Sequence, residues 1–128
     1  MSNRRRGRVR NTYRTGYLRS PAWFRRRDHW FSRAERRGPV ACAACGSPGT
    51  RRTLELHHLT YRGVRTLDGR WLATEHDDEL IPLHPGCHEL LHRLLDRDLV
   101  LARSRTRSTA SHLALQRLRA ALPPGRQP

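Results

Sequence analysis

Cysteines and histidines are the residues of this chain whose types and spacing could do chemistry. Cys42 and Cys45 form a C-x-x-C pair, and His84 and Cys87 repeat that spacing further along the chain. Three thiolates and one imidazole are a recognised ligand set for structural zinc, which prefers them to the oxygen ligands of magnesium. Because an odd number of cysteines is a poor disulfide framework, the spacing predicts a closed zinc site. The alternative is that the cysteines are ordinary small core residues.

Four further histidines lie near these cysteines. His57 and His58 are adjacent, and His88 and His92 are four residues apart on a predicted helix. Residues four apart share one face of a helix, so both can reach one site. Neighbouring residues of a regular strand point to opposite faces, so His57 and His58 can share a site only if the strand bends or ends there. A single histidine is more often structural than catalytic, but this group beside three thiolates favours a catalytic site.

Two strings within this region resemble a known family. Residues 56–61, LHHLTY, and residues 87–92, CHELLH, resemble the zinc-knuckle branch of the HNH endonucleases. The resemblance covers roughly residues 20–92, including the SPAW sequence at the start of a helix. It implies a ββα-metal core, in which a β-hairpin and a helix hold one catalytic divalent ion: Mg²⁺, Mn²⁺ or Ni²⁺.

The resemblance also implies a role for each histidine. His58 would be the general base that takes a proton from the attacking water, and a neutral imidazole suits that task at neutral pH. His57 and His88 would be ligands of the catalytic metal, and His92 would add a ligand or a phosphate contact. The ion would bind a phosphate oxygen and the leaving 3′ oxygen, where charge develops as the bond breaks.

Two positions depart from the family pattern. Glu79 stands where the family has an asparagine that shapes the loop, and we expect it to serve the catalytic site in that place. A carboxylate can accept the hydrogen bonds of an amide but cannot donate them. His84 replaces the first cysteine of the usual second pair.

Apolar spacing and capping residues predict the elements that position these side chains. Ser20 and Pro21 begin a helix that Gly38 and Pro39 end. The expected elements are a helix at about 21–37, a strand at 52–59, a long loop at 62–78, a strand at 80–83, and helices at about 86–97 and 111–122. The fold class is therefore α+β: a small ββα-metal (HNH) core with a structural zinc knuckle, flanked by an N-terminal and a C-terminal helix.

Length and charge indicate the domain organisation. A chain of 128 residues suits one domain, and we expect a basic, disordered arm at 1–19, a nuclease domain at 20–98 and a basic tail with a short helix at 99–128. The net charge is +15, and arginines gather near both ends. Such arms are typical of proteins that bind polyanions. The alternative is that they are solvated charged tails with no specific role, which have the same composition. The candidate contacts to a nucleic-acid backbone are Arg25, Arg26, Arg62 and Arg65.

These features predict a metal-dependent endonuclease that hydrolyses DNA. Its biological role stays open, and a larger phage, restriction or mobile-element assembly is one setting for such an enzyme. No segment reads as a signal peptide or a membrane span, so we expect a soluble, cytoplasmic protein with no membrane partner. The main alternative is a non-catalytic, zinc-stabilised nucleic-acid-binding module, which Glu79 favours. A two-zinc structural protein that binds another protein is a third hypothesis. Sequence specificity, and the choice between DNA and RNA, stay open because arginine arms carry no base code.

Overall fold

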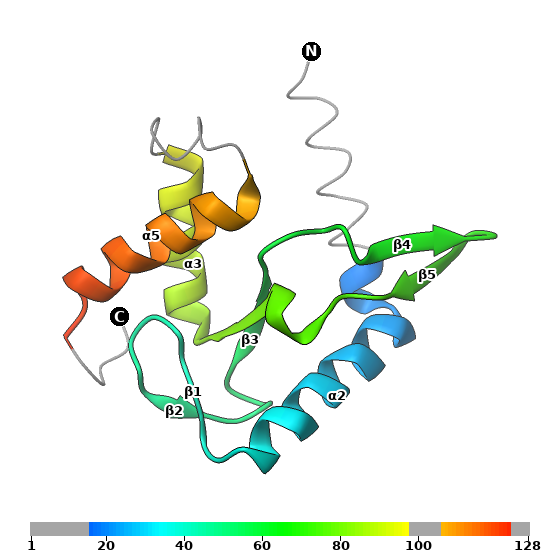
Figure 1. Ribbon diagram of the computed structural model, residues 1–128, viewed down its shortest axis with the longest axis horizontal. Helices are drawn as coiled ribbons and strands as arrows, with labels where there is room; N and C mark the ends of the chain where they lie inside the picture. Colours follow the sequence, from blue (N-terminus) through cyan, green and yellow to red (C-terminus); the bar gives the residue numbers. More distant parts are fainter. Residues whose placement is uncertain (1–15, 98–105, 124–128) are drawn as a thin grey trace.

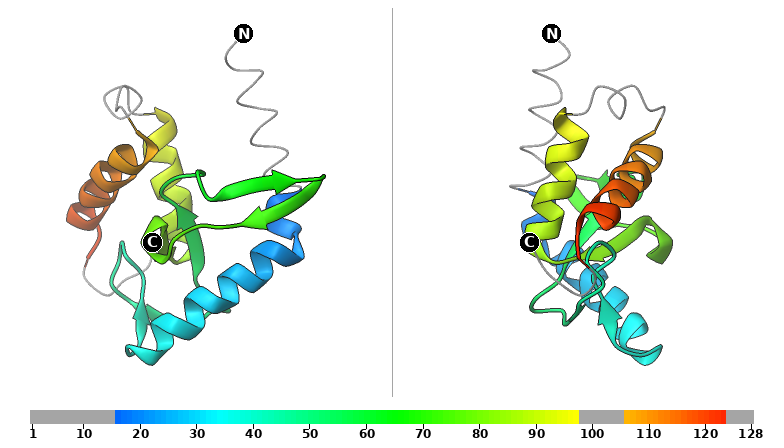
Figure 2. Two further views of the ribbon diagram at one scale, coloured as in Figure 1. Left: turned by 45° about the vertical axis from the view of Figure 1, so that its right-hand side comes forward. Right: turned by 90° about the vertical axis from the view of Figure 1, so that its left-hand side faces the viewer.

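The computed structural model describes residues 16–97 and 106–123, which form an α+β fold (Figure 1). In chain order the elements are η1 (Tyr17–Arg19), α2 (Pro21–Arg36), β1 (Val40–Ala41), β2 (Pro48–Gly49), β3 (Glu55–His58), β4 (Val64–Leu67), β5 (Arg70–Ala73), η2 (Asp77–Glu79), β6 (Leu80–Leu83), α3 (Pro85–Arg97) and α5 (Arg107–Ala121). Helices α3 and α5 lie side by side on one side of β3, and α2 and the β4–β5 hairpin lie on the other (Figures 1 and 2).

Helix α2 begins and ends where the sequence predicts. The side chain of Ser20 accepts a hydrogen bond from the backbone N–H of Trp23, and Pro21 occupies the first helical turn. Trp23 and Phe31 turn their rings into the core, where they are almost fully buried. The helix ends at Arg36, two residues before Gly38.

Strands β3 and β6 pair antiparallel, and α3 follows β6 directly. The register places His57 opposite Ile81 and His58 opposite Leu80. The second strand and α3 confirm the predicted elements at 80–83 and about 86–97. The first strand is shorter than the predicted 52–59, because the backbone N–H groups of Thr53 and Leu54 both donate to the carbonyl of Thr50 in a turn.

The prediction of a long loop at 62–78 is wrong. Strands β4 and β5 form an antiparallel hairpin there, closed by Asp68 and Gly69 at φ values of 51° and 76°. Positive φ at both central residues is the requirement of the tight two-residue turns that favour Asp-Gly. Gly63 precedes the hairpin where a Cβ would come within 2.5 Å of the backbone of Glu75, so only glycine lets the two segments meet.

Helix α5 begins earlier than the predicted residue 111. Thr106 caps it by accepting a hydrogen bond from the backbone N–H of Thr109. Ala114, Leu115 and Leu118 are buried in the same core as α3. The segment is therefore a packed part of the fold. Residues 99–105 and 124–128 of the predicted tail lie outside the described residues.

The predicted disordered arm at 1–19 also needs a correction at its end. Tyr17 in η1 is fully buried in the core, against Trp23 and Trp71 at ring distances of 5.6 and 5.4 Å. Residues 1–15 lie outside the described part of the chain. Among the helices of residues 16–97 and 106–123, none has the length and apolar character that crossing a bilayer requires.

Candidate metal centres and the histidine pocket

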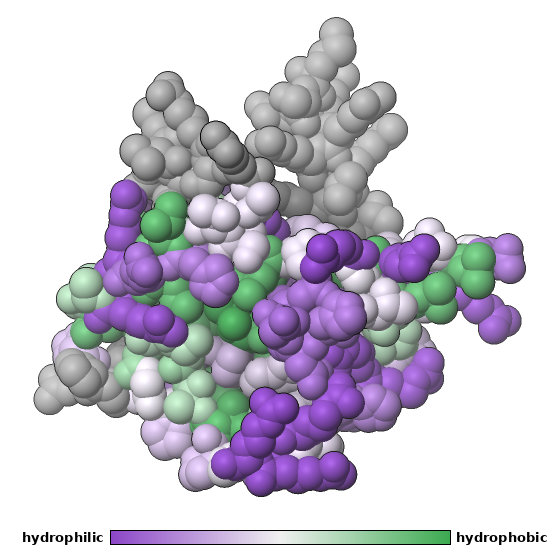
Figure 3. Space-filling view, viewed as in Figure 1, coloured by the Kyte–Doolittle hydropathy of each residue, from purple (hydrophilic) through white to green (hydrophobic). Residues whose placement is uncertain are grey.

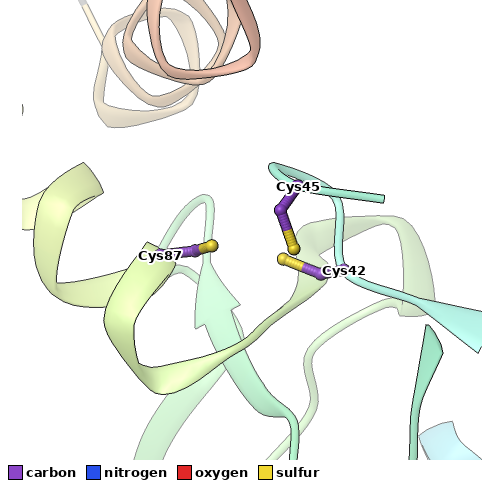
Figure 4. A group of neighbouring side chains, drawn as sticks. All are labelled: Cys42, Cys45 and Cys87. Carbon is purple, nitrogen blue, oxygen red and sulfur yellow. The ribbon is translucent and has the colours of Figure 1, made fainter. Parts of the chain in front are cut away.

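Three buried thiols form the first candidate metal centre. The sulfur atoms of Cys42, Cys45 and Cys87 all lie within 4.8 Å of one another (Figure 4). The first two come from the turn between β1 and β2, and the third from the first turn of α3. That turn is closed by hydrogen bonds from Cys42 N–H to Ser47 and from Gly46 N–H back to Cys42. The cluster could hold a metal ion, as the C-x-x-C spacing predicts.

His84 lies beside this cluster and contacts two of its three thiols. Its Nδ1 is 3.5 Å from the sulfur of Cys45, and its backbone N–H donates to the sulfur of Cys42 at 3.4 Å. The group whose ligand atoms are mutually within 4.8 Å contains only the three thiols. The predicted four-ligand set is thus present as three close thiols and a neighbouring imidazole.

The protonation of the thiols differs within the cluster. Burial raises the pKa of Cys45, but hydrogen bonds from Ser47 and His84 outweigh it and lower the pKa to about 6. Burial and the neighbouring Cys42 raise the pKa of Cys87 to about 12. Thiolate is the form that binds metal, so a bound cation would have to displace the proton of Cys87.

Three imidazoles form the second candidate metal centre. Nδ1 of His57 lies 3.2 Å from Nε2 of His88, and Nε2 of His92 lies 3.0 Å from that same atom. One ring comes from β3 and the other two from successive turns of α3. Their ligand atoms lie within 4.8 Å of one another, so this group could also hold a metal ion. The structure thus brings together the three residues that the sequence predicts as ligands of the catalytic metal.

The remaining nitrogens of two of these rings have partners of their own. Nε2 of His57 is 2.9 Å from the hydroxyl of Ser111, and Nδ1 of His88 is 3.1 Å from a carboxylate oxygen of Glu55. Such partners orient the ring and select the nitrogen that faces a metal. Burial, followed by the charge of Arg107, lowers the pKa of His57, and burial lowers that of His88 against the opposing effect of Glu55. Both shifts favour neutral imidazole, the form that binds metal.

His58 takes different partners from its neighbour His57. Its Nε2 donates to a carboxylate oxygen of Glu75 at 2.6 Å, and the hydroxyl of Tyr17 donates to the same oxygen at 2.5 Å. The ring is 2% exposed and lies between Trp23 and Tyr61, at 4.8 and 5.7 Å. Strand β3 ends at His58, as a shared site requires, and the two adjacent histidines line one pocket from different directions.

That pocket has a volume of about 330 Å³. The residues that line it and could do chemistry are His57, His58, Tyr61, His88, His92 and Arg107, together with the carboxylates of Glu55, Glu89 and Asp96. Arg107 comes from the first turn of α5, where its Nε donates to the carbonyl of His58 and its guanidinium lies 4.4 Å from the ring centre of Tyr61. The pocket therefore combines a possible metal centre, a separate histidine and a cation that suits a phosphate.

Glu75 is the site residue that the sequence does not reveal. It is 5% exposed at the end of the hairpin segment, where the sequence predicts a loop. Burial alone raises its pKa, but hydrogen bonds from His58 and Tyr17 hold the pKa below the ordinary value. Its two partners lie 17 and 58 residues away in the chain, so no short-range spacing of residues in the sequence predicts the contact.

Glu79 lies apart from the residues that line the pocket. One carboxylate oxygen accepts from the backbone N–H of His76, the other lies 3.4 Å from Arg62, and its carbonyl accepts from the N–H of Leu59. These bonds shape the turn that leads into β6. Glu79 therefore acts as a loop-shaping acceptor, and the structure does not place it where it could touch reacting atoms in the pocket.

The four arginines predicted to contact nucleic acid divide into two groups. Arg25, Arg62 and Arg65 are exposed. Arg26 is 8% exposed, with its guanidinium bonded to the carbonyl of Glu75 and to the carboxylate of Asp77. Arg26 thus has a structural role instead of the predicted one, because its inward position on α2 directs it to the segment between β5 and η2.

Asp77 joins that segment to α2. Its carboxylate is 2.6 Å from Arg26 and 2.7 Å from Arg33. Burial alone raises the pKa of Asp77, but the hydrogen bonds from Arg33 and Arg26 hold it below the ordinary value. A carboxyl whose pKa is depressed by folding stabilises the fold above its unfolded-state pKa, and this stabilisation is lost as the pH falls through the folded-state pKa.

We expect Asp77→Asn to lower the free energy of unfolding at neutral pH. Asp77 is 35% exposed, so the expected loss is about 1–2 kcal/mol, below that of a fully buried pair. Urea unfolding measured across the acidic range should show the difference from the wild type shrinking as the wild-type carboxylate protonates. Asp78→Asn, at a neighbouring position, is the control and should change little. A loss that stays constant down to the lowest pH would contradict the assignment.

Comparison of the chain with protein-family models, with curated proteins and with solved structures finds no match. The function is therefore argued from the side chains themselves. The strongest features are the two groups of possible metal ligands and the pocket that the histidines share.

Proposed function

We propose that the chain is a metal-dependent endonuclease of the HNH type, which hydrolyses phosphodiester bonds of DNA. One observation carries the proposal: a single pocket holds three converging imidazoles, a fourth histidine bonded to a buried carboxylate, and an arginine. The succession of two paired strands, β3 and β6, and then α3 is compatible with a ββα-metal core and supports the proposal. The thiol cluster would hold structural zinc at the start of α3.

His57, His88 and His92 would hold the catalytic divalent ion. Three neutral nitrogen ligands suit Mn²⁺, Ni²⁺ or another transition metal better than Mg²⁺, which prefers oxygen. Such an ion supplies Lewis-acid stabilisation to the phosphate and to the leaving oxygen. In the same pocket, the guanidinium of Arg107 would pair with the phosphate charge and orient the backbone of the substrate.

His58 would take the proton of the attacking water. Its Nε2–H is committed to Glu75, so Nδ1 is the basic atom of the ring. The buried carboxylate fixes the tautomer and would stabilise the imidazolium that forms, as the aspartate does in a serine-protease triad. Tyr17 holds that carboxylate from the other side, which makes Glu75 and Tyr17 positioning residues.

The test is cleavage of supercoiled plasmid by the purified full chain. With Mn²⁺, Ni²⁺ or Mg²⁺ added, we expect nicked or linear DNA, and an excess of EDTA should stop the reaction. Salt-sensitive binding without cleavage under any of these ions would instead favour the non-catalytic binding module. Two tightly held zinc ions with no affinity for DNA would favour the structural two-zinc protein.

Glu75→Gln tests the positioning of the base. The amide keeps the size of the side chain but loses the charge that stabilises the imidazolium, so we expect kcat to fall about 100-fold, within the range of about 10² to 10⁴ that a general base contributes. KM for DNA should stay near the wild-type value, because Glu75 is buried away from the solvent. Glu35→Gln, at an exposed site on α2, is the matched control. An unchanged kcat in a folded Glu75→Gln variant would contradict this role.

Ser111→Ala tests the contribution of α5 to the metal centre. Loss of the hydroxyl beside Nε2 of His57 removes a partner that orients a ligand, and such losses cost about 10- to 100-fold in metal affinity or activity. Isothermal titration with Mn²⁺ or Ni²⁺ measures the effect directly. Ser108→Ala, on the same helix, should leave the affinity unchanged. Equal affinities in both variants would show that α5 does not support the centre.

A further inference from the structure

The β4–β5 hairpin has two faces of different character. Side chains alternate along a strand, and Val64, Trp71 and Ala73 pack against the core, with the ring of Trp71 5.4 Å from that of Tyr17. The other face carries Arg65, Leu67, Arg70 and Leu72, all of them exposed. Leu67 is 61% exposed and Leu72 is 37% exposed, so neither contributes much to the core.

The register builds this outer face from mixed pairs. Arg65 lies opposite Leu72, and Leu67 lies opposite Arg70, so each cross-strand pair combines a guanidinium with an apolar side chain. Within residues 16–97 and 106–123, β4 and β5 pair only with each other. The hairpin projects past the rest of the fold in Figures 1 and 2, and in Figure 3 its projecting end shows hydrophobic surface directly beside hydrophilic surface.

Charge on this segment favours an anionic partner. Between residues 62 and 74 the sequence has Arg62, Arg65 and Arg70, and the only acid is Asp68 in the turn. Leu67 is too exposed to stabilise the fold, and an apolar side chain next to arginines on a projecting ribbon is suited to contact with a DNA groove. A two-stranded ribbon has the width of a DNA groove, and leucine side chains make apolar contacts or wedges there while arginines bind the flanking phosphates.

We propose that the outer face of the β4–β5 hairpin is a docking surface for duplex DNA. Arg65 and Arg70, which lie on different strands, bind phosphates, and Leu67, directly opposite Arg70, contacts the groove beside them. The identity of this partner rests on the proposed function, but the contact does not depend on the chemistry in the histidine pocket. The hairpin would hold the duplex while the pocket acts on it.

Two kinds of variant separate the apolar contact from the ionic ones. In the zinc-loaded full chain without added Mn²⁺, Ni²⁺ or Mg²⁺, we measure the affinity for a labelled DNA duplex by fluorescence anisotropy over a range of salt concentrations. Arg65→Gln combined with Arg70→Gln should weaken binding and reduce the slope of log affinity against log salt by about 0.9 for each phosphate that is no longer neutralised. Leu67→Ser should weaken binding about fivefold or more with an unchanged slope.

The controls are exposed residues of the same types elsewhere. Leu113→Ser on α5 and Arg36→Gln at the end of α2 should bind DNA like the wild type. All variants should keep the wild-type melting temperature, because the changed side chains are exposed. If the hairpin variants bind DNA with the wild-type affinity and salt dependence, the proposal is wrong, and the outer face of the hairpin would be a candidate surface for a protein partner instead. If those variants bind DNA as the wild type does and still cut plasmid, only the docking surface is wrong. If they bind more weakly and the wild type itself cuts no plasmid under any of the ions, the docking surface is supported and the nuclease is contradicted.

Discussion

His58→Ala is expected to stop DNA cleavage while metal content and DNA binding persist. A general base contributes about 10² to 10⁴ in rate, and no other described side chain bonded to Glu75 can replace the imidazole, since Tyr17 holds the same oxygen only as a donor. The measurement is the initial rate of plasmid nicking with saturating Mn²⁺, together with the metal content of the purified variant. Cleavage at the wild-type rate would remove His58 from the mechanism.

Burial makes the choice of variants important for this test. His58 is 2% exposed and packs against Trp23, so alanine leaves a cavity and deprives Glu75 of a partner. His58→Gln keeps most of the side-chain volume and has an amide that can donate to the carboxylate of Glu75. We expect it to be as inactive as His58→Ala but to melt at a higher temperature than that variant. His112→Ala, an exposed histidine on α5, is the matched control and should cleave normally.

The ligand groups could be predicted because their spacing is local. Cys42 and Cys45 lie in one turn, His88 and His92 on one helix face, and the pairing of β3 with β6 brings the separate parts together. Capping residues and apolar periodicity similarly predict α2 and α3. Short-range physics decides the two local ligand pairs and the bounds of the helices, so a single sequence reveals them, whereas the pairing of β3 with β6 is a long-range contact.

The partners of these ligands could not be predicted in the same way. Ser111 lies 54 residues from His57, and Glu75 reaches His58 only because the β4–β5 hairpin folds back. The sequence does not predict the hairpin, although Asp68 and Gly69 are a strong turn signal. Thr66 lies on the inner face, where alternation would show an apolar residue, and Leu67 and Leu72 lie on the outer face, where it would show polar ones. Tertiary contacts therefore decide which histidines converge as possible metal ligands and which one bonds to Glu75.

The two candidate centres depend on each other through α3. Cys87 lies in its first turn and His88 is the next residue, so an ion held by the thiols would fix the end of the helix that presents two of the three imidazoles. An ion bound there would add its binding free energy to the stability of this part of the core. Loss of the proposed zinc should therefore remove the proposed activity by destabilising the fold and not by removing a catalytic ion.

Cys42→Ser is the variant that tests this dependence, and we expect it to lose both the zinc and the folded state. Hydroxyl is a poor zinc ligand, and the binding free energy of a structural zinc site is also folding free energy, so the cost exceeds about 3 kcal/mol. Zinc analysis and circular dichroism melting of the purified variant measure the two effects together. Ala43→Ser adds a hydroxyl to the same turn without removing a ligand and should keep zinc and melting temperature. If the Cys42→Ser protein contains no zinc and yet melts at the wild-type temperature, the thiols are ordinary core residues. The histidine pocket would then keep its structure without a metal ion at the thiol cluster.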